Sequence, residues 1–190
     1  MADIKHLRGY TVQESLNQVL GDVIRVTPVV STSNYTQDYL LFDSTEIPNA
    51  VSYPGGVSKL ISWTIVDYNA NELHSGLSGA YDFEIFFHQV HQSMGTVNAQ
   101  PNVSDANYKA AKMLGWRKVN ASDWRSNNSS ADGGVSIYTN TSVDNDPMQN
   151  MFLKAEPNST SVYFHATLGA DNAKFTNADD LQFAFNIAYR

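Results

Sequence analysis

The stretch Leu40–Asn69, which reads LLFDSTEIPNAVSYPGGVSKLISWTIVDYN, carries the most regular pattern in the chain. An apolar run is followed by turn residues at Pro48-Asn49 and Pro54-Gly55-Gly56, and then by apolar residues that alternate with polar ones over Ile61–Val66. Proline fixes φ, glycine reaches positive φ, and asparagine tolerates left-handed geometry, so both clusters predict turns. Alternation with a period of two predicts a strand with one buried face. The stretch therefore predicts strands reversed at turns, and it raises the question whether those turns frame a reactive site.

Three further segments alternate in the same way, and each predicts a strand. Burial of one large apolar side chain contributes roughly 1.5–3 kcal/mol, so these strands and Ile61–Val66 supply most of a core. The apolar rows are Leu181, Phe183, Phe185, Ile187 and Tyr189; Val162, Phe164, Ala166 and Leu168; and Tyr81, Phe83, Ile85 and Phe87.

Shorter apolar segments predict additional strands at Val23–Val30, Tyr39–Phe42, Val135–Tyr138 and Met151–Ala155. Many short strands separated by turn residues, without the spacing of βαβ units, are typical of an antiparallel sandwich. We therefore predict an all-β fold, a jelly-roll-like antiparallel β-sandwich.

One segment has a helical pattern instead. Ser104 can cap a first turn, Gly115 can end a last turn, and Tyr108, Ala111 and Leu114 fall at helical spacing between them. The sequence predicts a short helix here, lying across one edge of the sandwich.

The two ends of the predicted domain organisation differ in pattern. Residues 1–28 lack a clean strand period and are predicted to form an N-terminal arm, with a short helix possible over Val12–Leu20, whereas residues 29–190 form the β-sandwich domain. The polar stretch Asn120–Gly134 offers few apolar side chains and is predicted to be an exposed loop.

The bulk composition bounds the class of protein. At 190 residues the chain suits one domain with a real core. A net charge of -7 and a pI near 5.0 argue against a nucleic-acid partner, because such proteins carry clustered Lys and Arg. No apolar run is long enough to span a bilayer, and the N-terminal residues do not resemble a signal peptide, so we expect a cytosolic product and no membrane partner. With no cysteine, disulfides and thiolate chemistry are excluded.

Several residue pairs have the composition of metal sites. His88 and His91 form an H-x-x-H pair, but residues three apart in a strand point to opposite faces, so a shared metal is geometrically awkward. Asp144-Asn145-Asp146 could bind a hard cation, yet the glycine and distal glutamate of an EF-hand are missing, and a solvated acidic turn is favoured. We therefore predict no metal site.

Catalytic patterns are equally sparse. Asp82 and Glu84 fall on one face of a predicted strand roughly 7 Å apart, within the range that inverting glycosidases use, although two acids on a wet face are usually only solvated. No G-x-S-x-G nucleophile motif occurs, and neither Gly55-Gly56 nor Gly133-Gly134 has the context of a phosphate loop. We therefore predict no catalytic residue and no cofactor, and we interpret Pro48 and Gly55-Gly56 as architecture.

Three aromatic residues near polar loops leave an alternative open. Trp116, Trp124 and Tyr138 could stack on sugars, or they could be core or interface anchors. The sequence does not separate these interpretations.

Four blocks, in order, resemble a known family. They are Leu41–Val51, which reads LFDSTEIPNAV, with Gly55–Leu60 and Ile65–Asp67; Val103–Asn107 leading to Leu114-Gly115; Ser161–Ala166; and Thr176–Leu181 before the last strand. From about Val29 to the C-terminus, this order resembles the capsid decoration (cement) proteins of tailed bacteriophages. The arm and the loop at Asn120–Gly134 depart from the family pattern.

The resemblance implies a virion structural protein, not an enzyme, that binds the outer surface of an icosahedral capsid and stabilises it. It implies the major capsid protein as partner, contacts between neighbouring copies such as a trimer, and assembly in the bacterial cytoplasm. The alternative is a carbohydrate- or receptor-binding sandwich of a phage tail or surface apparatus. A glycoside hydrolase that uses Asp82 and Glu84 is a third possibility, and it requires an open cleft between them.

Overall fold

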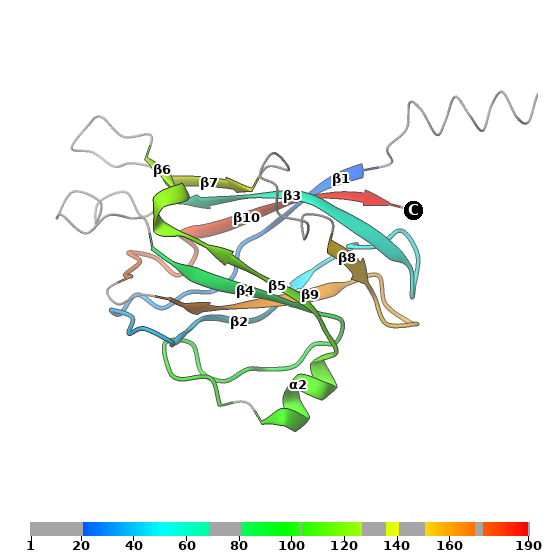
Figure 1. Ribbon diagram of the computed structural model, residues 1–190, viewed down its shortest axis with the longest axis horizontal. Coiled ribbons are helices and arrows are strands. Elements are labelled where there is room, and N and C mark those ends of the chain that lie inside the picture. Colours follow the sequence, from blue (N-terminus) through cyan, green and yellow to red (C-terminus); the bar gives the residue numbers. More distant parts are fainter. Residues whose placement is uncertain are drawn as a thin grey trace, which may run out of the picture.

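The computed structural model describes residues 21–68, 81–102, 104–126, 136–140, 151–169 and 173–189. Within these residues the chain forms strands packed in two layers, with one short helix outside them (Figure 1). The strands are β1 (Gly21–Val26), β2 (Leu40–Ile47), β3 (Val57–Asp67), β4 (Phe83–His88), β5 (Met113–Val119), β6 (Arg125–Ser126), β7 (Ser136–Asn140), β8 (Met151–Lys154), β9 (Val162–Leu168) and β10 (Leu181–Tyr189), and the helices are α2 (Asp105–Ala111) and the 3-10 turn η2 (Ala121–Asp123).

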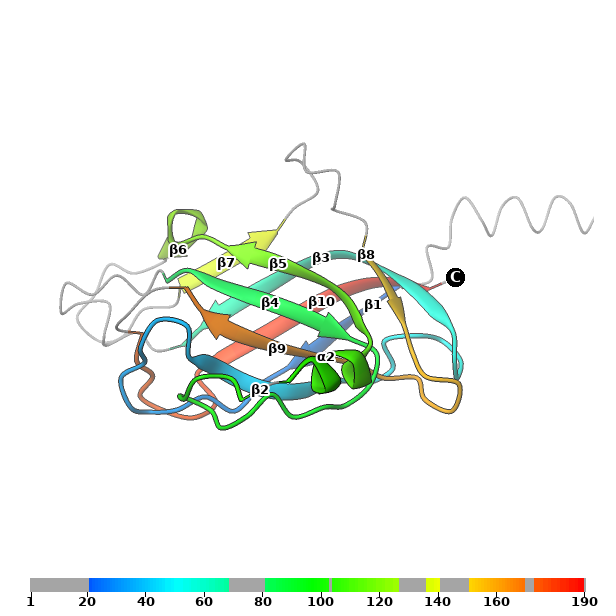
Figure 2. The ribbon, with the colours of Figure 1, turned by 60° about the horizontal axis from the view of Figure 1, so that its bottom comes forward.

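The strands of the described residues pair into two antiparallel sheets. Sheet A has the order β1-β10-β3-β7-β6, with β8 also paired to β3, and sheet B has the order β2-β9-β4-β5. The chain pairs from its ends inward, β1 with β10, β2 with β9, β3 with β8, and β4 with β5. This nesting of antiparallel pairs, divided between two sheets, is the topology of a jelly roll. The predicted all-β, jelly-roll-like sandwich is confirmed, and Figure 2 shows the two sheets one behind the other.

Alternation along the central strands fills the space between the sheets. In β10, Phe183, Phe185 and Ile187 are buried, while the residues between them are half-buried on the other face. The register sets Phe183 opposite Ile65 and Phe185 opposite Trp63 on β3, so both strands turn the same face inward. Burial of each such side chain contributes roughly 1.5–3 kcal/mol. The predicted apolar rows therefore form the core, except at Ile61, which is 38% exposed because a register shift between Asn186 and Ile187 turns it outward and leaves Leu60 buried in its place.

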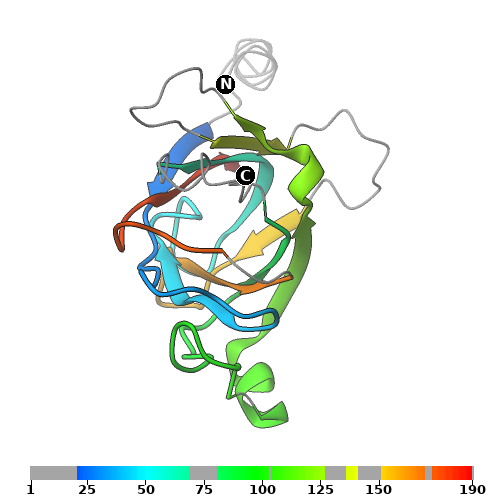
Figure 3. The same cartoon turned by 90° about the vertical axis from the view of Figure 1, so that its left-hand side faces the viewer.

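Aromatic rings join the two sheets at the centre of that core. Phe183 of sheet A lies edge-on to Phe42 and Phe164 of sheet B, with ring centroids 5.4 and 5.1 Å apart. Phe185 lies edge-on to Phe164 at 5.0 Å. Edge-to-face pairs of this kind add about 0.5–1.5 kcal/mol beyond their buried area. The view in Figure 3 shows the two layers enclosing this space.

The turns between β2 and β3 are structural. Asn49 has a φ of 52°, and Gly55 has a φ of 72°. A Cβ on Gly55 would lie 3.1 Å from Cα of Pro157, and one on Gly56 would lie 2.8 Å from the carbonyl oxygen of Tyr53. Gly55 is therefore needed because the β8–β9 connection packs against this turn, and Gly56 because the turn folds back on Tyr53 as it reverses the chain between two core strands.

The prediction for Ser104–Gly115 is half right. Ser104 caps α2 and accepts a hydrogen bond from the N–H of Asn107 at 3.4 Å, as predicted. The helix ends at Ala111, because Lys112 takes a left-handed conformation with a φ of 54°. Gly115 does not end the helix but lies in β5 opposite Phe87, where a Cβ would meet the methyl of Met151 at 2.9 Å. Pairing with β4 overrides the helical spacing of Leu114.

Two predicted boundaries are wrong. Residues 21–26, assigned by sequence to the arm, form β1, which pairs along its whole length with β10, so the sandwich begins before residue 29. The stretch Asn120–Gly134 contains η2 and β6, and its Trp124 is buried at 6% exposure. Tertiary contacts supply the order that local composition does not. The helix predicted over Val12–Leu20 and the rest of that loop lie outside the described residues.

Candidate functional site

The predicted acid pair has structural partners. Asp82 lies just before β4 and accepts a hydrogen bond from the N–H of Ala121, and its other oxygen lies 3.9 Å from Nζ of Lys118. Glu84 lies on β4 with its side chain on the outer face of sheet B, in register with Lys118 on β5. Asp82 thus fixes the start of η2 to the sheet edge, and Lys118 lies beside both acids.

The three predicted aromatics separate into two groups. Trp124 and Tyr138 are buried with ring centroids 6.0 Å apart, and Nε1 of Trp124 donates to the carbonyl oxygen of Tyr81 at 3.2 Å. Both are core residues. Trp116 on the edge strand β5 is 49% exposed and stacks on Phe86 at 6.5 Å. Only Trp116 among the three is available to a partner.

The H-x-x-H pair lies at the end of β4. His88 is fully buried on the outer face of sheet B, and its Nδ1 lies 2.8 Å from the carbonyl oxygen of Val90. A carbonyl can only accept, so Nδ1 carries the proton and Nε2 is left with a lone pair. His91 lies beyond the strand, is exposed, and packs edge-on against Tyr163 of β9 at 5.4 Å.

A second buried histidine, which the sequence analysis did not single out, accompanies His88. His165 on β9 is 1% exposed, its ring lies 5.3 Å from that of His88, and it stacks on Phe86 at 5.0 Å with an interplanar angle of 8°. The sequence pattern does indicate that His165 points outward from its predicted strand. The pattern does not indicate that His165 is buried, because outward positions of a sandwich are usually solvated.

A bulge in β2 brings a carboxylate to the same place. The register passes from Phe42 opposite Ala166 to Thr45 opposite Phe164, so two residues, Asp43 and Ser44, oppose His165 together. Bulges re-aim side chains and disrupt the ladder locally. Here the bulge places the Asp43 carboxylate near the histidine pair, on which its charge acts.

Residues 89–94, which we call the crossing segment, cover this cluster. The chain leaves β4 at His88, and His91 then contacts Tyr163 on β9. At the far strand β2, the Ser93 hydroxyl and the Met94 N–H each donate to an oxygen of Asp43 at 2.6 Å. In Figure 1 the chain after β4 runs below sheet B, on the side away from sheet A. The outer face of sheet B is therefore closed over its histidines by the chain itself.

The closed cluster is polar but incompletely hydrogen-bonded. Within the described part of the chain, Nε2 of His88, Nδ1 of His165 and Oγ of Ser44 are buried without a hydrogen-bond partner. Burial lowers the pKa of His88, and burial together with the neighbouring His88 lowers the pKa of His165 to about 3. Both rings are therefore neutral at physiological pH.

The described residues contain no group of three or more His, Asp or Glu side chains placed to hold a metal ion. Asp144-Asn145-Asp146 lies outside the described ranges. In the same part of the chain, no helix is long and apolar enough to cross a bilayer.

The outer face of sheet A differs from that of sheet B. The central strand β10 presents small and neutral side chains, and Asn186 donates a hydrogen bond to Ser62 of β3 at 2.8 Å across the surface. The strand β3 and the flanking strands add larger apolar and basic side chains. The outward residues are Val23 and Arg25; Gln182, Ala184, Asn186 and Ala188; Val57, Lys59, Ile61, Ser62, Thr64 and Val66; Ile137 and Thr139; and Phe152 and Lys154.

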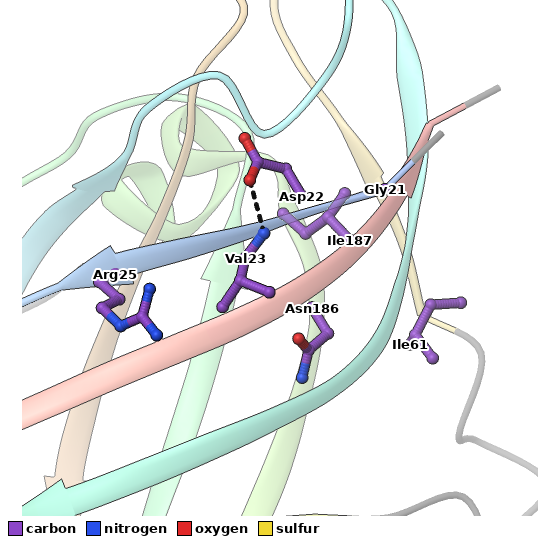
Figure 4. Close-up of a pocket in the computed structure, with 7 residues that line it drawn as sticks. All are labelled: Gly21, Asp22, Val23, Arg25, Ile61, Asn186 and Ile187. Atoms are coloured by element: carbon purple, nitrogen blue, oxygen red, sulfur yellow. Dashed lines mark hydrogen bonds between the residues drawn. The ribbon is translucent and has the colours of Figure 1, made fainter. Parts of the chain in front are cut away.

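No acidic side chain belongs to this outward row of the described strands. Asp67 is buried in the core, and Asp22 lies on the opposite side of β1 from Val23 and Arg25 (Figure 4). A shallow groove lined by Val23, Arg25 and Ile61, among others, runs along the β1 edge. Among the described residues, Asp22 is the one carboxylate that lines this groove, and the outward row of the open face carries neutral and basic side chains.

Comparison with models of protein families gives no matching family, and comparison with curated proteins gives no matching relative.

Proposed function

We propose that this protein is a virion structural protein that binds the outer surface of an icosahedral phage capsid and stabilises it, as a capsid decoration protein. The observation that carries the proposal is the open outer face of sheet A, whose outward row in the described strands carries no acidic side chain, on a jelly-roll fold. The order of sequence blocks that resembles the decoration family supports the same assignment.

The face has the properties that adhesion to a protein lattice requires. Val23, Ile61 and Phe152 are exposed at 44%, 38% and 48%, and each would lose water contact against a flat partner. Burial of that apolar area contributes about 25 cal/mol per Å². The small side chains of Ala184 and Ala188 on β10 allow close approach of a second surface. Arg25 and Lys154 at the rim favour a partner with acidic groups.

A protein that binds the assembled shell more tightly than its separate subunits stabilises the shell by mass action. Many copies on one lattice multiply the effect without a large interface for each copy. Neither requirement involves a cleft, and the major capsid protein is the partner that the proposal names.

The test uses heads purified from the phage that encodes the chain. We expect the protein in a copy number related to the lattice, and we expect Val23→Glu to weaken binding to undecorated heads at least about ten-fold, because it buries a carboxylate. The matched control is Val29→Glu, since Val29 is 68% exposed and follows β1 away from the outward row. Finding the protein only at the tail tip would refute the head assignment.

A second candidate is a carbohydrate- or receptor-binding protein of a tail or surface apparatus. The observation that favours it is Trp116, exposed on sheet B and flanked by the polar side chains of Glu84 and Lys118. Stacking on a sugar ring with hydrogen bonds at its rim suits this arrangement. A glycan array with wild type and Trp116→Ala tests it, and absence of binding across host polysaccharides would retire it.

A further inference from the structure

The histidine cluster on sheet B has a feature that adhesion does not use. His88 and His165 are held neutral and buried, with lone pairs or N–H groups that have no partner among the described residues. Unsatisfied buried polar groups cost free energy in a folded protein. Such a cost is recovered when the groups become exposed, and the crossing segment is what separates them from water on the outer side.

The charged and titratable groups around the pair come from three elements. Asp43 of β2 is the neighbouring carboxylate, and its charge favours a protonated His88 or His165. His91 of the crossing segment opposes protonation of His88. Tyr163 of β9 stacks on His88 at 6.1 Å, and burial raises its pKa, so its hydroxyl stays neutral. Along the same face, Glu84 and Lys118 lie beyond Phe86.

We propose that the crossing segment is a proton-operated latch, which closes over the neutral His88–His165 pair and is released from the outer face of sheet B when the pair is protonated. The closed state is fastened at Asp43 by the Ser93 hydroxyl and the Met94 N–H. The open state exposes both rings to water.

The direction of the effect follows from the charges. Protonation of both rings would place two positive charges on rings only 5.3 Å apart, beneath a segment that excludes water. Burial is the largest influence on both pKa values and lowers them, while attraction to Asp43 is smaller and raises them. The closed latch is therefore stable above the unfolded pKa of about 6.5 and is weakened as the pH falls below it.

The size of the effect follows from the pKa difference. With a free histidine pKa of about 6.5 and a closed-state pKa of about 3 for His165, the open population should rise about thirty-fold between about pH 7.5 and pH 5 through His165 alone. His88 adds to this rise in proportion to its own lowered pKa.

The experiment is amide hydrogen exchange on the full chain, corrected for the intrinsic pH dependence of exchange. We expect protection of the Met94 amide, which is bonded to Asp43, to fall at least about thirty-fold from pH 7.5 to pH 5. Protection of the Phe183 amide in β10, which exchanges only when the whole fold opens, should stay well above that of Met94 at both pH values. Equal protection of Met94 at both pH values, or protection of Met94 no lower than that of Phe183, would overturn the latch.

Two variants identify the histidine that operates it. His165→Phe keeps a ring that can stack on Phe86 and removes the titrating group, so the pH-dependent loss at Met94 should shrink about thirty-fold. His91→Phe is the matched control, because that exposed ring lies outside the buried pair, and it should leave the loss within about three-fold of wild type. A wild-type loss in His165→Phe refutes the assignment. If that variant does not fold, the wild-type measurement at two residues still decides.

Discussion

Both sheets of this sandwich alternate buried and outward side chains along their strands, yet one outer face is open and the other is covered. The outer face of sheet A carries small, neutral and basic side chains and stays open, with Ile61 exposed near its centre. The outer face of sheet B carries His88, His165 and Leu40, which are buried under residues that follow β4. A jelly roll needs only its inner faces to fold, so each outer face is free to serve another purpose. Here one face is left for a partner and the other is closed by the chain itself.

The largest effect should separate the two outer faces by stability. Leu40 on sheet B is fully buried with Met94 and Ala111, outside the main core. Leu40→Ala should lower the free energy of unfolding by about 2–5 kcal/mol, because it leaves a cavity under the covering chain. Ile61→Ala on sheet A, at a site already 38% exposed, should cost less than about 1.5 kcal/mol. Urea denaturation measures both changes in the free energy of unfolding, and equal values would contradict the contrast between a covered and an open outer face.

Trp116 on β5 and Trp124, between η2 and β6, provide a second contrast. Trp124→Ala should cost at least about 3 kcal/mol, because it empties a buried site and removes the bond to Tyr81. Trp116→Ala should cost only about 1 kcal/mol, the worth of one aromatic stack, since that ring is half exposed. Thermal and urea unfolding of both variants test this, and a large loss at Trp116 would show that β5 is covered.

Acid should destabilise the fold through sheet B. The pKa of His165 is about 3 in the folded chain and about 6.5 in the unfolded chain, so its stabilising contribution is complete above pH 6.5 and is lost as the pH falls toward 3. Between pH 7 and pH 5 the free energy of unfolding should fall on the order of 2 kcal/mol from this residue. The fall should be smaller in His165→Phe, and an identical pH dependence would contradict the assignment.

The smallest effect concerns the fastening at Asp43. Asp43→Ala should cost about 1–2 kcal/mol, because the Ser93 hydroxyl and the Met94 N–H lose a charged acceptor in a partly exposed site. Asp43→Asn keeps one oxygen and should cost about half as much. Asp105→Ala, on the exposed first turn of α2, is the control and should stay within about 1 kcal/mol of wild type. If Asp105→Ala lowers the free energy of unfolding as much as Asp43→Ala does, the hydrogen bonds from Ser93 and Met94 to Asp43 do not stabilise the closed segment.

Local pattern was a good guide wherever burial follows alternation. The apolar row of Phe183, Phe185 and Ile187 is buried as predicted, and Ser104 caps a helix as predicted. The same reasoning failed for Leu114 and Gly115, where helical spacing competed with pairing to β4, and for Trp124, which packs in the core from a polar stretch. In each of these wrong predictions, the contact that determines the structure is made with a residue distant in sequence, and local spacing cannot predict such a contact.

The sequence by itself determined that this protein is a two-layer β structure, because a period of two forces one face of each strand into a core whatever the order of the strands. Only the tertiary structure decided which outer face would be covered. His88, His165 and Asp43 come from three different strands, and they meet because the sheet order β2-β9-β4 and the bulge at Asp43 set them side by side. Alternation predicts that a side chain points outward. Whether that side chain then meets water, a partner or another part of the chain depends on where the following segment crosses the sheet.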